Sequence, residues 1–147
     1  MTATPPPPET ARTGDSIGKL TFGPISRRTL ALYAGVSLDH NPIHIDIDFA
    51  RKAGQPDVFA HGMLGMAQFG RLVTGWAGAA RISALSARFV AIVPVHAELL
   101  VTGTVTDRRA QGDETELELA LRAVLQDGTP VLKGSATVHL AAASQIS

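Results

Sequence analysis

The second half of the chain reads almost entirely as β-strand, and a single long apolar helix precedes it. Alternating or β-branched apolar residues predict strands over residues 82–95, 98–108, 114–125 and 131–141. Asp127-Gly128, between the last two, predicts a tight hairpin. Residues 63–76 are apolar around most of a helical circumference and predict a buried helix. One buried helix and an antiparallel meander predict an α+β domain whose sheet curls around the helix.

Three glycines, at positions 65, 70 and 75, weaken that helix intrinsically. We expect close approach of other parts of the chain to explain them.

The first half of the chain predicts two shorter helices. Ser26 is a typical N-cap residue, and Gly35 is suited to the left-handed position that ends the helix after it. Asp46 or Asp48 can cap a second helix over residues 49–53.

The N-terminus carries four consecutive prolines, which predict a disordered, extended tail over residues 1–14. A weak strand over residues 17–22 follows it, and we expect residues 15–147 to form a single domain.

Charge and composition exclude several classes of function. Thirteen basic and 13 acidic residues give a net charge of +0, and aromatics make up only 5%, so we expect no nucleic-acid partner and no anionic membrane surface. The absence of cysteine excludes disulfides and thiolate metal sites and is compatible with the cytoplasm. No uncharged apolar run has the length of a membrane span.

The loop over residues 37–44 places a carboxylate and an imidazole around a rigid bend. Proline at position 42 keeps Asn41 out of helical geometry, with Asp39 before the bend and His44 after it. Such a pair could share one water, one group accepting its proton and the other donating. The alternative is an Asx-turn aspartate and a histidine that only hydrogen-bonds the loop.

Gly62 opens the long helix, where backbone N–H groups lack intrahelical acceptors and the helix dipole is positive. An oxygen that gains negative charge would be stabilised there. The alternative is an ordinary tight helix entrance.

Metal binding and nucleophilic hydrolysis receive little support. His40 and His44 have a zinc-ligand spacing only on a common helix face, and Pro42 between them breaks that geometry even with Asp46 nearby. A G-x-S-x-G elbow is absent. We therefore predict neither metal nor cofactor, and taken alone His61, like His96 and His139, has a structural role by default.

Two motifs carry a family resemblance. They are Tyr33-Ala-Gly-Val-Ser-Leu-Asp39-His-Asn41-Pro42-Ile-His44-Ile-Asp46 and Ala60-His61-Gly62-Met63. Together they resemble the signature of the MaoC-like (R)-specific enoyl-thioester hydratases, and especially the (3R)-hydroxyacyl-acyl carrier protein dehydratase subunits. The likeness extends over about residues 15–141.

The resemblance implies a hot-dog fold, in which an antiparallel sheet wraps a long central helix, and reversible hydration of trans-2-enoyl thioesters. It implies that Asp39 and His44 hold the catalytic water and that Gly62 N–H polarises the thioester carbonyl. The implied substrate-binding residues are Asn41, His61 and Met63. The implied partners are an acyl-CoA or acyl-carrier-protein substrate and a second subunit, either identical or a paralogue.

The chain departs from the family pattern at three places. Leu38 replaces a common glycine, Gly70 replaces a serine found in some relatives, and residues 94–98 replace a Pro-Gly-Asp turn.

Two other functions remain open. A hot-dog thioester hydrolase commonly has an acidic residue on the central helix, and this helix has only Gln68. A non-catalytic subunit of a heterodimer is the other.

Overall fold

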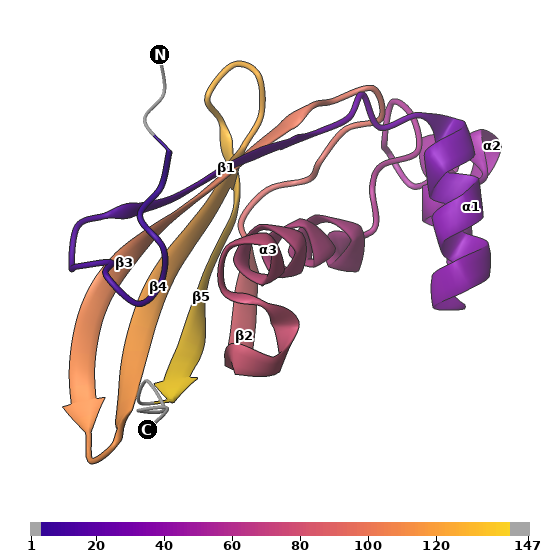
Figure 1. The fold of residues 1–147 in the computed structure, drawn as a ribbon. Coiled ribbons are helices and arrows are strands. Elements are labelled where there is room, and N and C mark those ends of the chain that lie inside the picture. Colours follow the sequence, from indigo (N-terminus) through magenta and orange to yellow (C-terminus); the bar gives the residue numbers. More distant parts are fainter. Residues whose placement is uncertain (1–3, 142–147) are drawn as a thin grey trace.

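The computed structural model describes residues 4–141, which form a curved five-stranded antiparallel sheet around one long helix (Figure 1). The strand order is β1-β3-β4-β5-β2, and the bounds are β1 Ser16–Phe22, β2 Ile82–Phe89, β3 Leu99–Gln111, β4 Glu114–Val124 and β5 Pro130–Ala141. The helix α3, Gly62–Ala77, packs on one face of the sheet. This confirms the predicted α+β arrangement. In the described part of the chain, no helix has the length and apolar character needed to cross a membrane.

The helix α3 is buried on one side only. Its buried positions are Leu64, Gly65, Gln68, Phe69, Leu72, Val73 and Ala77. On the other side Met63 is 55% exposed, and Arg71 and Thr74 are exposed. The prediction of a helix buried all round is therefore wrong for this chain, because the sheet curls over one side of α3 and leaves the other side open.

Close packing of α3 against the sheet depends on two glycines. A Cβ at Gly65 would lie 3.0 Å from Leu132, and a Cβ at Gly134 would lie 2.8 Å from the ring of Phe69. The prediction of close approach is confirmed for Gly65. It is wrong for the other two helix glycines, since a Cβ at position 70 would meet only an ordinary contact and one at position 75 would meet nothing within 4 Å.

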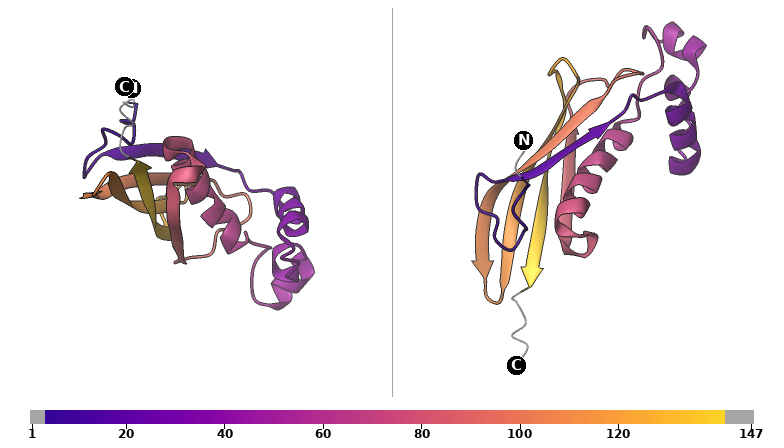
Figure 2. Two further views of the ribbon diagram at one scale, coloured as in Figure 1. Left: turned by 60° about the horizontal axis from the view of Figure 1, so that its bottom comes forward. Right: turned by 45° about the horizontal axis from the view of Figure 1, so that its top comes forward.

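Two short helices lie beyond one end of the sheet, beside the N-terminal end of α3 (Figure 2). The first, α1, spans Arg27–Ser37, and the Ser26 side chain accepts a hydrogen bond from Thr29 N–H, as predicted. It does not end at Gly35, because Leu38 takes the left-handed conformation, with φ 62° and ψ 15°.

The second helix, α2, spans Ile47–Lys52. The Asp46 carboxylate caps it by accepting hydrogen bonds from the amides of Asp48 and Phe49. Asp46 is thus the cap, and Asp48 belongs to the helix itself.

The strand predicted over residues 82–95 ends at Phe89. Its partner strand β5 begins at Pro130, and Phe89 pairs with Leu132 near that end. Residues 90–93 instead form a loop, and Ala60 N–H donates to the carbonyl of Val93 across 2.9 Å. This loop is thereby held against the segment that leads into α3.

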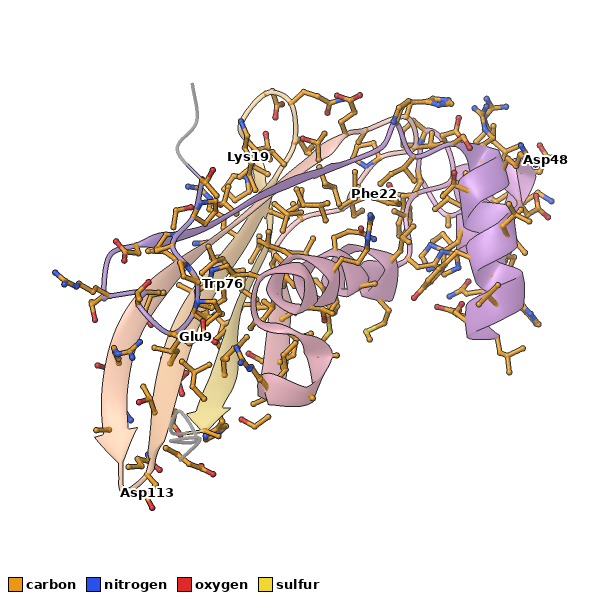
Figure 3. The ribbon with its side chains drawn as sticks, viewed as in Figure 1. Glu9, Lys19, Phe22, Asp48, Trp76 and Asp113 are labelled. Atoms are coloured by element: carbon orange, nitrogen blue, oxygen red, sulfur yellow. The ribbon has the colours of Figure 1, made fainter. Side chains whose placement is uncertain are left out.

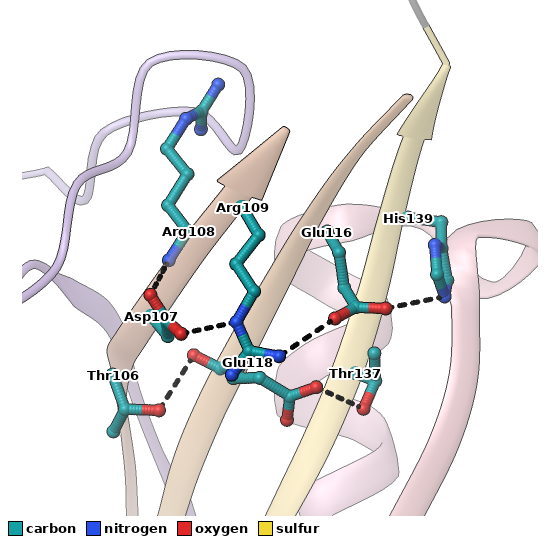
Figure 4. A network of polar contacts seen from close by, with 8 residues as sticks. All are labelled: Thr106, Asp107, Arg108, Arg109, Glu116, Glu118, Thr137 and His139. Atoms are coloured by element: carbon teal, nitrogen blue, oxygen red, sulfur yellow. Dashed lines mark hydrogen bonds and ion pairs between the residues drawn. The ribbon is translucent and has the colours of Figure 1, made fainter. Parts of the chain in front are cut away.

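The opposite face of the sheet is polar. Strand alternation directs Leu117 and Leu119 into the core and Glu116 to the other face. There Arg109 and His139 flank Glu116, with nitrogen–oxygen distances of 3.7 Å on each side (Figure 4). Exposed ion pairs of this kind contribute little to stability, so this face mainly keeps the sheet solvated.

The prediction of a disordered tail over residues 1–14 is wrong for most of that segment. Residues 1–3 lie outside the described residues. Ala11 is fully buried. The Arg108 guanidinium donates to the carbonyls of Pro8, Glu9 and Ala11 at 3.0–3.1 Å. The Trp76 indole donates to the carbonyl of Pro6 at 2.8 Å, and Trp76 and Glu9 lie at the same end of α3 in Figure 3. Proline lacks a backbone N–H but keeps its carbonyl acceptor. The carbonyls of Pro6 and Pro8 therefore accept hydrogen bonds from Trp76 and Arg108.

Replacing Arg108 with alanine should lower the free energy of unfolding by about 1–3 kcal/mol, because three carbonyls lose a charged donor. Urea denaturation measures the change. Arg122→Ala, at an exposed arginine on β4, is the matched control and should change stability by less than about 0.5 kcal/mol. Equal losses of stability in the two variants would contradict the role of Arg108 in holding the N-terminal segment.

Candidate active site

The loop between α1 and α2 is held by two successive side-chain turns. The Asp39 Oδ1 accepts a hydrogen bond from Asn41 N–H at 3.2 Å, and the Asn41 side chain accepts one from Ile43 N–H at 3.2 Å. Asn41 also caps the short helix Pro42–His44. The Asx-turn interpretation of Asp39 is therefore correct, and it leaves the second carboxylate oxygen free of that turn.

His44 is held in one tautomer by the backbone. Its Nδ1 lies 2.8 Å from the carbonyl oxygen of Phe59. A carbonyl can only accept, so Nδ1 carries the proton and Nε2 of the neutral ring keeps a lone pair. The Phe59 ring packs edge-on at 5.1 Å. The imidazole is 9% exposed and borders the cavity through which a reactant would enter.

His61 lies directly beside His44. The two rings stack with centroids 4.1 Å apart and planes 29° apart, and Tyr33 packs edge-on against His61 at 4.9 Å. His61 is 1% exposed, and its Nε2 lies 3.1 Å from the carbonyl oxygen of Asp39. Burial lowers the pKa of His61, and the neighbouring His44 lowers it further, against the opposing effect of the Asp39 carbonyl.

These contacts bring three groups together. A carboxylate oxygen of Asp39 and one ring nitrogen each of His44 and His61 all lie within 4.8 Å of one another. That spacing admits one water molecule that hydrogen-bonds to the flanking groups. Sequence reasoning paired Asp39 with His44 but missed the contact with His61, because no local spacing relates the loop to the start of α3.

The same three side chains also have the composition of a metal site. His44 Nδ1 and His61 Nε2 are each already hydrogen-bonded to a backbone carbonyl, so neither nitrogen can ligate an ion without losing that bond. The set weighed and set aside from sequence, which was His40, His44 and Asp46, is a different one: His40 is exposed, and Asp46 caps α2.

Gly62 presents an unpartnered amide at the start of α3. His61 occupies the N-cap position without a side-chain cap hydrogen bond, and within residues 4–141 Gly62 N–H has no hydrogen-bond acceptor. A Cβ at this position would lie 3.1 Å from the Phe89 ring. The absence of a side chain thus lets an aromatic ring approach the helix terminus, whose dipole favours negative charge.

A cavity of about 340 Å³ borders His44 and Gly62. Apart from His44 and Gly62 its wall is apolar, formed by Phe59, Ala60, Phe89, Val90, Ala91, Ile92, Val93 and Leu132. The loop 90–93 was missed as a site element, because its apolar residues continue the strand pattern, and Pro94 is the one signal of an earlier end. Asp39, Asn41, His61 and Met63 are not among the lining residues.

The lowered pKa of His61 predicts a pH-dependent stability. The unfolded chain binds the proton more readily than the folded protein, so the free energy of unfolding should fall as the pH drops below about 6.5. Urea midpoints measured between about pH 7.5 and pH 5 test this. His61→Phe should show a shallower decline, whereas His40→Asn, at an exposed histidine, should match the parent protein. Identical slopes in all three would contradict it.

Comparisons with known proteins agree with this geometry. The family model described as "MaoC like domain" matches residues 10–125. The R-hydratase PhaJ1 from Pseudomonas aeruginosa superimposes with a TM-score of 0.80 at 26% identity, over 92% of this chain and 85% of that one. An (R)-hydratase from A. caviae, involved in PHA biosynthesis, gives 0.79 at 26% identity, over 88% and 97%.

A shorter match joins the chain to a curated relative. The mitochondrial 3-hydroxyacyl-acyl-carrier-protein dehydratase of Arabidopsis thaliana is 43% identical over 49 residues, which is 33% of this chain and only 30% of that protein. The predicted hot-dog fold is confirmed by the two hydratase structures. Since the family model covers most of the residues, the chain belongs to the MaoC-like dehydratase family.

Proposed function

We propose that the protein catalyses the reversible hydration of trans-2-enoyl thioesters to (3R)-hydroxyacyl thioesters. One observation carries this proposal: the Asp39 carboxylate and the His44 ring converge within 4.8 Å, and His44 borders the same apolar cavity as the unpartnered amide of Gly62. Family membership and two structurally similar proteins named as (R)-hydratases support it.

The chemistry follows from where the protons are held. A water between Asp39 and His44 adds its hydroxyl to the β-carbon of the enoyl group. The proton that it loses to the pair is delivered to the α-carbon, so the pair returns to its starting state. The two groups act on one water, and the proton transfers belong to the pair. Gly62 N–H and the α3 dipole stabilise the enolate oxygen that forms between these steps.

The cavity supports an acyl thioester as the substrate. Its wall is apolar except where His44 and Gly62 border it, which suits an acyl chain with a reactive group at one end. The carrier would be coenzyme A or an acyl carrier protein. Substrate contacts by Asn41 and Met63 stay predictions, and so does a cytoplasmic location.

A second subunit is part of the proposal. Strand β2 lies at an edge of the sheet, and large apolar side chains near the cavity, such as Met63, Phe89 and Ile92, are about half exposed. A homodimer, or a heterodimer with a paralogue, would cover this surface.

The hydrolase alternative is weakened by Gln68. This side chain is buried; its Nε2 donates to the carbonyl of Leu64 at 2.9 Å, and its Oε1 accepts from Arg71 at 2.8 Å. Both ends of the amide are occupied, and Gln68 does not border the cavity. Incubation with crotonyl-CoA separates the functions: loss of enoyl absorbance without free thiol indicates hydration, and release of free thiol indicates hydrolysis.

Asp39→Asn and His44→Gln should each reduce kcat/KM for crotonyl-CoA hydration by at least ~100-fold, the scale of general acid–base catalysis. His40→Gln, one residue from Asp39 and exposed, is the control and should retain activity within about threefold. Unchanged activity in the first two variants, shown by thermal melting to be folded, would contradict the catalytic roles of Asp39 and His44. If the activity is that of a complex with a paralogue, the same result would indicate a non-catalytic subunit.

Gly62→Pro removes the proposed oxyanion donor without disfavouring the helix, because proline is tolerated at the first helical position. It should lower kcat by about 100- to 1,000-fold. Gly62→Ala introduces the same Cβ against Phe89 but keeps the N–H, so it isolates the steric effect. Steady-state kinetics of Gly62→Pro and Gly62→Ala are compared. Equal losses of kcat in the two variants would exclude a role for the Gly62 amide.

A further inference from the structure

His61 occupies a helix N-cap position but does not cap the helix. Its side chain makes no hydrogen bond to the first-turn amides of α3, although N-cap side chains commonly satisfy such a donor. The ring turns instead toward the loop that carries Asp39. One consequence is that the Gly62 amide stays available to a ligand. Another is that the imidazole is committed to contacts inside the protein.

The first of these contacts joins the loop to the helix. His61 Nε2 donates to the backbone carbonyl of Asp39 across 3.1 Å, because that oxygen can only accept. The Asp39 side chain is exposed and its own turn is local. The bond from His61 is therefore what links the backbone of this residue to the start of α3.

The second contact supports His44. The stacked His61 ring covers one face of the His44 imidazole, while the Phe59 carbonyl and ring hold its Nδ1 side. A side chain fixed by both packing and hydrogen bonds keeps its reactive nitrogen in one direction.

This arrangement carries a cost to folding. With the proton on Nε2, His61 Nδ1 is a buried acceptor, and among residues 4–141 it has no hydrogen-bond partner. Buried polar atoms without partners are rare and costly. A phenylalanine would fill a similar space without that cost, which indicates that the hydrogen bond to Asp39 is the property that histidine supplies here.

We propose that His61 is a positioning residue of the hydration reaction: it holds Asp39 by a hydrogen bond and His44 by stacking, and it does not contact the substrate. The absence of substrate contact replaces the substrate-binding role that the family resemblance implied for His61. The burial of His61, which is 1% exposed, supports this, and the inference rests on the proposed function.

Three substitutions separate the two contacts. His61→Phe keeps a ring for stacking and loses the donor. His61→Gln places an amide N–H where Nε2 was and loses the ring. His61→Leu loses both. We expect kcat for crotonyl-CoA hydration to fall by about 100-fold in the leucine variant and by about 10-fold in the other two, because small displacements of reacting groups have effects of this size. KM should stay within about threefold of the parent value.

Binding of butyryl-CoA, a saturated analogue that cannot be hydrated, gives an independent readout by calorimetry. Its Kd should be unchanged in all three variants. A raised Kd or KM with unchanged kcat would overturn the proposal in favour of substrate contact, and parent-like kcat in all three would overturn it altogether. Thermal melting verifies folding, and His61→Phe should fold well because it removes the unpaired nitrogen.

Asp39→Asn distinguishes failure of this proposal from failure of the proposed function. If Asp39→Asn abolishes hydration while the His61 variants retain it, only the positioning role is wrong. If the parent protein does not hydrate crotonyl-CoA, the proposed function itself is wrong; if it does and Asp39→Asn retains the activity, the catalytic role of Asp39 is wrong.

Discussion

The close contact between α3 and the curved sheet is the constraint on which the site depends. Leu132 packs over Gly65 and the Phe69 ring packs over Gly134, and a Cβ on either glycine would force the neighbouring side chain to shift. This packing fixes where the N-terminal end of the helix stands. The amide of Gly62 consequently borders a cavity whose other walls come from β2, β5 and the loop after β2. A helix set further from the sheet would not form this cavity with the same residues.

Two backbone carbonyls determine the chemistry of the two histidines. The carbonyl of Phe59 fixes the proton of His44 on Nδ1, and the carbonyl of Asp39 fixes that of His61 on Nε2. The ring nitrogen that is not bonded to a carbonyl is therefore Nε2 in His44 and Nδ1 in His61, and the latter nitrogen is buried. The same residue types have different roles because their acceptors lie at different ring nitrogens. Asp39 combines a structural turn with its proposed catalytic role, since the turn uses only one of its oxygens.

Several local predictions failed where a distant contact decided the outcome. Consecutive prolines cannot form a regular hydrogen-bonded element and so predict disorder, yet Arg108 supplies donors to three carbonyls of that segment. Gly35 has the intrinsic preference for a helix end, but α1 continues to Ser37 and a leucine adopts the left-handed conformation. Apolar residues 90–93 continue a strand pattern, yet the chain leaves the sheet after Phe89 and forms a cavity wall.

The sequence by itself determined the α+β class, the central helix, the hairpin and the cap at Ser26, and it limited the second cap to Asp46 or Asp48, because hydrophobic periodicity, turn chemistry and capping act over a few neighbouring residues. It also singled out Asp39 and His44, which share one short loop, as candidates for the catalytic pair. Only the tertiary structure decided the N-terminal contacts, the cavity wall and the stacking of His61 on His44. Those features join positions that are far apart in the chain, and no spacing in the sequence records which of them meet once the helix has packed into the sheet.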